Sequence, residues 1–305
     1  MSNKNNMIEK RETEFTNAKT FDAAASKVLQ KCAGYSFYQH YSHLESILTK
    51  IIQKRWFLTR CSSKKMNDLQ EPLKFDGGTG LLDRSYVACF GHGMTESVAM
   101  WGLYGKSSPF ALRVTIPGNT LEKWMSDIEI QSGVKAQKGA VGLLNVKTTD
   151  GKAIPRGNIC ASVFRDMLYA AVGNKEKPDE FDIRRSKSLC WGNGYYHLKV
   201  DEDIYDGVVD GRYAGFIKDI EWRYEDETRL CIRLKKDIGE DNISIAIPPY
   251  VIEAMRFTFS PWLRKEEESA VKSVLEAALA STGIQVGKEF QRFRRSTLQG
   301  ALNFK

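Results

Sequence analysis

The stretch FIKDIEWRYEDETRLCIRL, residues 216–234, decides our expectation of the fold. Aromatic and aliphatic residues alternate with charged ones along it, and successive side chains of a strand point to opposite faces. This alternation places Glu225, Glu227 and Arg229 on one face, with the two carboxylates roughly 7 Å apart. From Leu230 onward the stretch turns apolar, so we predict one strand that enters the core at its far end.

That row of charges has two interpretations. It is either an exposed strand face whose ion pairs each add little stability, or a pair of catalytic carboxylates beside a guanidinium. The stretch alone does not choose between them, so the choice depends on the rest of the chain.

Composition indicates a folded protein that suits an anionic partner. Of 305 residues, 42% are hydrophobic and 11% aromatic, which argues against a disordered protein. The 45 basic and 38 acidic residues leave a net charge of +7, which permits a nucleic-acid partner. Six scattered cysteines, no visible signal peptide and no run long enough to span a bilayer lead us to expect a cytoplasmic protein with no membrane contact.

The chain before and after the stretch predicts an α+β fold. Residues 35–41 (YSFYQHY) predict an aromatic strand, and HLESILTKIIQ after it predicts an amphipathic helix with Ser42 as N-cap and Glu45 completing a capping box. Further helices are expected at 96–105 and after Pro261, and a last strand at 284–298. Strands outnumber helices without alternating regularly with them. We expect a polar extension and helix at 1–30, then a single domain at 31–305.

Two sets of residues resemble an uncharacterised bacterial domain family. One is FYQHYSHLESIL (37–48) with the Asn-Asp-x-x-Glu loop MNDLQE (66–71). The other is the Trp-x-Tyr-Glu-x-Glu-x-Arg strand in KDIEWRYEDETR (218–229). Between them lie the Cys-Phe pair at 89–90 and the Met-Trp-x-x-Tyr segment at 100–104. The resemblance covers about residues 35–300.

More distantly, the chain is similar to ADP-ribosyltransferases. The His-Tyr-Ser-His opening with its helix, and the later Glu-x-Glu, carry this resemblance, although no Ser-Thr-Ser follows and Thr59, Ser62 and Ser63 only stand in for it. It implies a split mixed or antiparallel sheet with flanking helices, NAD as substrate and nucleic acid (RNA or DNA) as first-guess acceptor. It also implies a toxin or phage-defence setting, with a possible neutralising partner protein.

The same resemblance implies roles for single residues. Glu227 would grip the ribose 2′-hydroxyl as an oxocarbenium-like charge develops, and Glu225 would orient or deprotonate the acceptor. Arg229 would meet the pyrophosphate or pair with a neighbouring carboxylate. The other residues implied to bind NAD are His40, Tyr41, Ser42, Asn67, Trp101 and Tyr104, with Trp101 or Tyr104 stacked on the nicotinamide.

Four alternatives remain open. An NAD glycohydrolase would use water as acceptor. A non-enzymatic nucleic-acid-binding module would use two basic clusters, one at Arg184, Arg185 and Lys187 and one at Arg292, Arg294 and Arg295. A zinc site could combine His40, His43, Cys89 and His92. A nucleophilic cysteine, Cys89 or Cys61, could act with His40.

Overall fold

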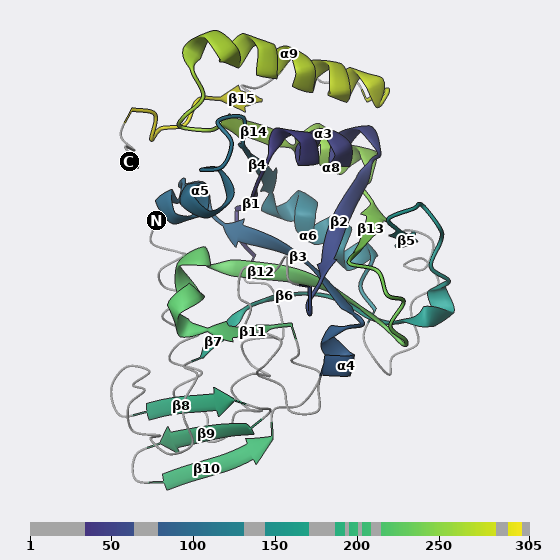
Figure 1. Ribbon diagram of the computed structural model, residues 1–305, viewed down its shortest axis with the longest axis vertical. Helices are drawn as coiled ribbons and strands as arrows, with labels where there is room; N and C mark the ends of the chain where they lie inside the picture. Colours follow the sequence, from purple (N-terminus) through teal and green to yellow (C-terminus); the bar gives the residue numbers. More distant parts are fainter. Residues whose placement is uncertain are drawn as a thin grey trace.

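A computed structural model describes residues 34–63, 79–130, 144–170, 187–192, 195–200, 203–208, 215–284 and 292–300. These residues form an α+β protein with a mixed sheet and flanking helices, which confirms the predicted fold class (Figure 1). The predicted extension and helix at 1–30, Asn67 and most of the insertion at 173–188 lie outside the described residues.

Within the described residues, ten strands form the main sheet. All of its pairings are antiparallel except the parallel pair β14–β15. The strands are β1 (Phe37–Ser42), β2 (Arg55–Arg60), β3 (Ser85–His92), β4 (Leu112–Pro117), β5 (Lys147–Thr148), β6 (Ile159–Asp166), β12 (Glu227–Leu234), β13 (Asn242–Ala246), β14 (Arg256–Phe259) and β15 (Phe293–Arg294).

Five further strands of the described ranges lie outside this sheet. A separate antiparallel sheet comprises β8 (Lys187–Gly192), β9 (Tyr195–Val200) and β10 (Asp203–Val208). The parallel pair consists of β7 (Leu168–Ala170) and β11 (Ile217–Asp219). Because β7 follows β6 after one residue, this pair brings the segment before β12 back toward the main sheet.

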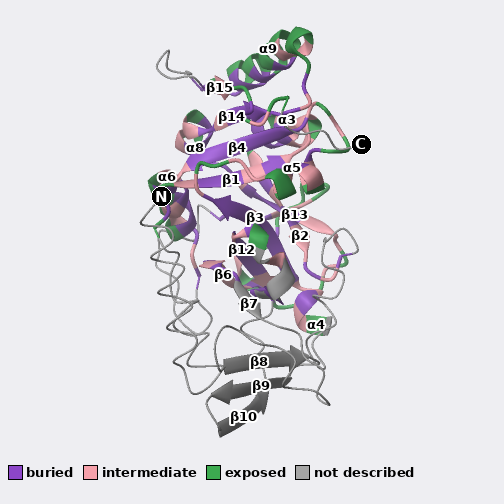
Figure 2. Cartoon of the chain, turned by 90° about the vertical axis from the view of Figure 1, so that its left-hand side faces the viewer, coloured by how far each residue is buried: buried purple, intermediate pink, exposed green. Residues whose placement is uncertain are grey.

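Helices flank the sheet, and the longer ones are amphipathic. They are α3 (Leu44–Ile52), α4 (Thr79–Leu82), α5 (Val98–Tyr104), α6 (Gly118–Asp127), α8 (Pro249–Ala254) and α9 (Lys265–Ser281), with 3₁₀ turns η2 (Arg156–Asn158) and η5 (Ile220–Glu225). Figure 2 shows α9 with one buried and one exposed face. None of the helices in the described ranges is long and apolar enough to cross a membrane.

The start of α3 differs from the prediction. Ser42 is the last residue of β1, so His43 occupies the N-cap position, and its side chain makes no capping bond. The predicted capping box at Ser42 and Glu45 is therefore wrong, because the strand pairing with β4 extends through Ser42. The helix itself follows the predicted pattern and buries Ile47 and Ile51.

The core lies between the sheet and these helices. Trp56 of β2 stacks on Phe90 of β3 with ring centroids 5.1 Å apart, and Trp124 of α6 meets Trp56 edge-on at 6.3 Å. Both tryptophans are fully buried. This aromatic cluster fixes β2 and β3 close to the point where the sheet divides.

Residues 216–234 do not form one strand. The stretch contains β11, the 3₁₀ turn η5 and then β12, so the prediction of a single continuous strand is wrong for residues 220–226. Asp226, between η5 and β12, has a left-handed backbone with φ of 47°. Such a φ is uncommon outside glycine, and Asp tolerates it better than most residues.

Candidate active site

The main sheet divides along one edge of β3. The other edge pairs with β12 over residues 85–91. On the divided edge, β1 pairs with residues 91 and 92, whereas β2 pairs with residues 86 and 87. Helix α3 joins β1 to β2, so the chain leaves the edge of β3 at residues 91 and 92 and returns to it at residues 86 and 87. Neither strand pairs with residues 88–90 in the described part of the chain.

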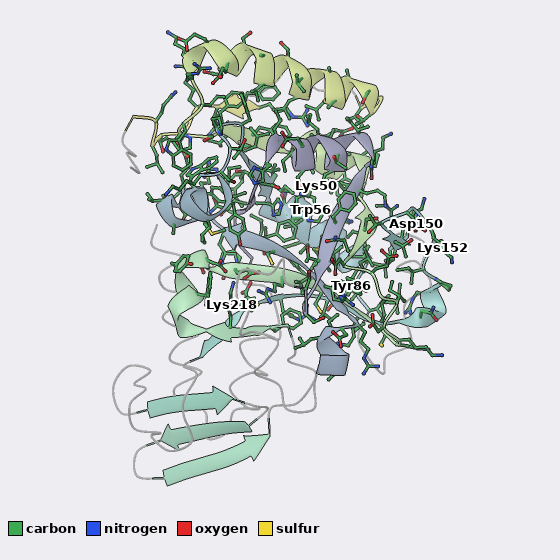
Figure 3. All side chains as sticks on the ribbon, in the orientation of Figure 1. Lys50, Trp56, Tyr86, Asp150, Lys152 and Lys218 are labelled. Carbon is green, nitrogen blue, oxygen red and sulfur yellow. The ribbon has the colours of Figure 1, made fainter. Side chains whose placement is uncertain are left out.

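A pocket of about 330 Å³ lies at this division. Its volume is at the lower end of the range typical of small-molecule sites, about 300–1,000 Å³. Charged residues enter it from two sides, Lys50 from α3 and Lys218 from β11, both labelled in Figure 3. The other polar residues that line it are Gln39, His40, Tyr41, Ser42, Ser46, Thr59, Cys89, Tyr104, Glu225, Glu227, Arg229 and Asn242.

His40 bridges the division. Its Nδ1 lies 3.1 Å from the carbonyl oxygen of Cys89, and its Nε2 lies 3.3 Å from Nζ of Lys50. Burial, helped by the charge of Lys50, lowers the pKa of His40 to about 3, so the imidazole is neutral. These partners assign the tautomer: Nδ1–H donates to Cys89, and Nε2 accepts from Lys50. The side chain of His40 thus makes the hydrogen bond to the backbone of β3 that a paired strand would otherwise make.

Glu227 is held by a buried ion pair with Arg229. Nε of Arg229 donates to Oε1 at 2.6 Å and Nη2 donates to Oε2 at 3.3 Å, the two-point geometry typical of Arg with a carboxylate. Arg229 is fully buried and also donates to the carbonyl oxygen of Gly215 at 3.0 Å. Burial alone would raise the pKa of Glu227, but Arg229 and Lys218 outweigh it and lower that pKa to about 2.

Glu225 has a different environment. Its Oε2 forms an ion pair with Lys218, but its buried Oε1 has no hydrogen-bond partner among the described residues. Burial and repulsion from Glu227 raise the pKa of Glu225 to about 7, against the opposing effect of Lys218. Two neighbouring carboxylates with pKa values moved apart are typical of acid–base sites.

The left-handed turn at Asp226 brings these carboxylates together. Glu225 ends η5 and Glu227 begins β12, yet both side chains line the pocket. Lys218 also holds the two carboxylates together by pairing with both. Its Nζ lies 3.7 Å from Oε2 of Glu227 and also contacts Glu225. Glu225, Glu227 and Arg229 all line the pocket, but Glu225 reaches it from η5 and not from the predicted strand face, which holds only for Glu227 and Arg229.

The structure brings most of the predicted site residues to this pocket. His40, Tyr41, Ser42, Tyr104, Glu225, Glu227 and Arg229 all line it. Trp101 does not: it is fully buried, donates to Glu96 at 2.9 Å and packs edge-on against Tyr41. A nicotinamide could not reach its ring, so that predicted role is wrong.

Two lysines of the pocket were missed by the sequence analysis. Lys218 belongs to the Lys-x-x-x-Trp-x-Tyr-Glu signature, so its place there was a usable signal. Lys50 lies three residues after Ile47 and one before Ile51, on the helix face that packs inward, which was the only signal for its burial.

Cys89 is not arranged as a nucleophile. Burial and the nearby carboxylate of Glu227 raise the pKa of its thiol well above the usual value, so the reactive thiolate is disfavoured. Its thiol is hydrogen-bonded to Glu227, and its backbone oxygen accepts from His40, so both contacts of Cys89 with the pocket are structural.

His92 belongs to a separate buried cluster on the opposite face of β3 and β12. Its Nδ1 lies 3.1 Å from Asp226, its Nε2 lies 3.5 Å from Asp166, and Tyr35 stacks on its ring at 3.6 Å. Thr228 completes the contacts. His40 and His92 therefore do not converge. No group of three or more His, Cys, Asp or Glu within the described residues is placed to hold a metal ion.

The predicted basic surface at the last strand is reduced to two residues. Arg292 is buried and donates to backbone carbonyl oxygens of Met255 and Ile252, so it is not a nucleic-acid contact. Arg294 and Arg295 are exposed, and Arg295 pairs with Glu268 at 2.6 Å. Arg184 and Arg185 lie outside the described residues.

Comparison with models of protein families, with curated proteins and with solved structures gives no match.

Proposed function

We propose that the protein transfers ADP-ribose from NAD to an acceptor in the pocket between α3 and β12. The observation that carries this proposal is Glu225 Oε1, a buried carboxylate oxygen without a hydrogen-bond partner among the described residues. A buried polar atom normally has a partner, so an unpartnered one in a pocket points to a ligand group that would complete it.

The chemistry divides between the two carboxylates. In the proposed step the C1′–N1 bond between ribose and nicotinamide breaks, and its electron pair leaves with nicotinamide. The acceptor forms the new bond to C1′, and its proton passes to Glu225, whose pKa of about 7 suits a general base near neutral pH. Glu227, kept ionised by Arg229, would stabilise the positive charge that develops on the ribose.

The size of the pocket supports a ligand of limited bulk. A volume of about 330 Å³ suits roughly the nicotinamide–ribose half of NAD, with the adenylate half extending outside it. Tyr104 is the member of the predicted Trp101–Tyr104 pair that could contact the nicotinamide, since it lines the pocket and Trp101 does not. Nucleic acid remains our first-guess acceptor, on the basis of the net charge of +7.

The test is incubation with adenylate-labelled NAD and separate pools of RNA, DNA and cell protein. Glu225→Gln keeps the shape of the side chain but removes the base, and we expect it to reduce transfer by about 10²- to 10⁴-fold. Glu276→Gln, at an exposed carboxylate of α9, is the matched control and should transfer normally.

Each outcome has a defined meaning. Label in one pool, lost in Glu225→Gln only, supports the transferase and identifies its acceptor class. Free ADP-ribose with no labelled pool would identify an NAD glycohydrolase, with water as the acceptor at the same site. NAD that stays intact with the folded wild-type protein would refute both, and salt-sensitive retention of RNA or DNA would then favour a binding module.

A further inference from the structure

Among the residues that the structure describes, Lys50 is a buried cation without an anionic partner. Its Nζ donates to Oγ of Ser46 at 2.8 Å and to Nε2 of the neutral His40 at 3.3 Å, and lies 5.4 Å from the ring centroid of Trp56. The residue is only 5% exposed. No carboxylate of the described residues lies within ion-pair distance of it. Lys218 and Arg229, the other cations of the pocket, both pair with Glu225 or Glu227.

A buried ammonium of this kind is costly to the folded state. Removing a charge from water costs free energy unless a counter-charge compensates it. Burial lowers the pKa of Lys50 to about 8, so the side chain still carries its charge at neutral pH. A methionine could fill the same space next to Ile47 and Ile51, so packing does not require a lysine here.

The charge of the whole pocket indicates what compensates Lys50. The lining contains three cations, Lys50, Lys218 and Arg229, and two carboxylates, Glu225 and Glu227. The balance is positive by one charge with both carboxylates ionised and by two when Glu225 is protonated. Ser42 and Ser46, from the same strand–helix unit as Lys50, add hydroxyl donors to this side of the pocket. Ammonium and hydroxyl donors together are a phosphate-binding set.

We propose that Lys50 is the phosphate-binding residue of this pocket and that the pocket therefore takes a nucleotide by its pyrophosphate, not an uncharged nucleoside. The proposal rests on the proposed function for the identity of that nucleotide as NAD. It also moves the pyrophosphate-binding role from Arg229 to Lys50. The sequence suggested Arg229 for this role, but Arg229 donates its hydrogen bonds to Glu227 and to the carbonyl oxygen of Gly215.

The experiment measures binding of ADP-ribose and of adenosine by calorimetry. Wild-type protein should bind ADP-ribose and not adenosine. Lys50→Met should weaken ADP-ribose binding by about 10- to 100-fold, as expected for loss of a charge-assisted hydrogen bond. Lys50→Arg should recover part of the affinity. Lys236→Met, at an exposed lysine of the turn before β13, makes the same charge change and should bind as the wild type does.

Two further readouts separate binding from a structural role. The wild-type affinity for ADP-ribose should fall as pH rises above about 8, where Lys50 loses its proton, and Lys50→Met should lack this dependence. Lys50→Met should also unfold at the same temperature as the wild type or higher. If Lys50→Met is less stable than the wild type but binds ADP-ribose normally, the proposal is overturned. Lys50 would then have the structural role of holding His40 by a hydrogen bond.

The proposal and the proposed function can fail separately. If ADP-ribose binds through Lys50 but NAD stays intact, the phosphate site stands and ADP-ribosyl transfer does not. If NAD is consumed and Lys50→Met leaves the KM for NAD unchanged, the transferase stands and the phosphate site is refuted. Absence of ADP-ribose binding to the folded wild type would also refute the phosphate site.

Discussion

We expect Glu225→Gln to increase the free energy of unfolding, relative to the wild type, by more at pH 8 than at pH 5. Burial and Glu227 raise the pKa of Glu225 from 4.5 to about 7 in the folded protein. The folded state therefore binds a proton that the unfolded state has released over the interval between these values. Stability is greatest below the unfolded pKa and falls as pH rises through the folded pKa. Glutamine does not ionise, so the variant escapes this loss.

The size of the effect follows from the same two pKa values. Raising a pKa from 4.5 to about 7 corresponds to about 3 kcal/mol of stability in total. Most of it, about 2–3 kcal/mol, develops between pH 5 and pH 8. Glu227, with a folded pKa of about 2, stays ionised in the folded protein throughout and adds only a small slope near pH 5, which wild type and variant share.

Urea unfolding of wild type and variant at pH 5, 6, 7 and 8 would measure this difference. The free energy of unfolding of Glu225→Gln minus that of the wild type should rise by about 2–3 kcal/mol between pH 5 and pH 8. Glu276→Gln, which removes an exposed carboxylate of α9, is the control variant in the same measurements. A difference for Glu225→Gln that does not change with pH would mean that Glu225 ionises normally, and the assignment of a buried base would be abandoned.

Three further predictions concern other features. Glu227→Gln removes the carboxylate that pairs with the fully buried Arg229 and should lower the free energy of unfolding by about 3–5 kcal/mol. Replacing both residues by Met should cost less. Equal losses in the two variants would contradict this explanation. Burial opposes protonation of His92, but its two carboxylate partners raise its pKa, so wild-type stability should decline more steeply above pH 6.5 than that of His92→Gln in thermal unfolding. Gly118→Ala would place Cβ 1.6 Å from a backbone oxygen and should cost about 1–3 kcal/mol or more in urea unfolding, whereas Gly102→Ala, with open space around it, should not destabilise.

The local patterns of the sequence predicted most individual elements. Helical spacing predicted α3 and its buried Ile47 and Ile51, and the aromatic run before it predicted β1. Alternation predicted β12 from Glu227 onward. These features depend on residues close together in the chain, which is why the sequence alone was enough.

The parts that were missed depend on contacts distant in sequence. The turn at Asp226 is stabilised by His92, 134 residues earlier, and no local pattern indicates that pairing. Lys50 was missed because amphipathic patterns assign charged residues to the exposed face, whereas here the charge faces a pocket. The division of the sheet depends on three strands and a helix at once, so neither β1 nor β2 alone could reveal it.

The divided edge of β3 also limits the kind of molecule that can approach it. An exposed strand edge normally invites another polypeptide to add as a further strand, with aggregation as the common result. Here β1 closes one end of the opening and β2 closes the other, leaving a gap three residues long. An extended peptide cannot lie along so short a gap, and the carbonyl oxygen of Cys89 within it already accepts a hydrogen bond from His40. The protein thereby keeps this strand edge closed to other chains without covering it by a further strand.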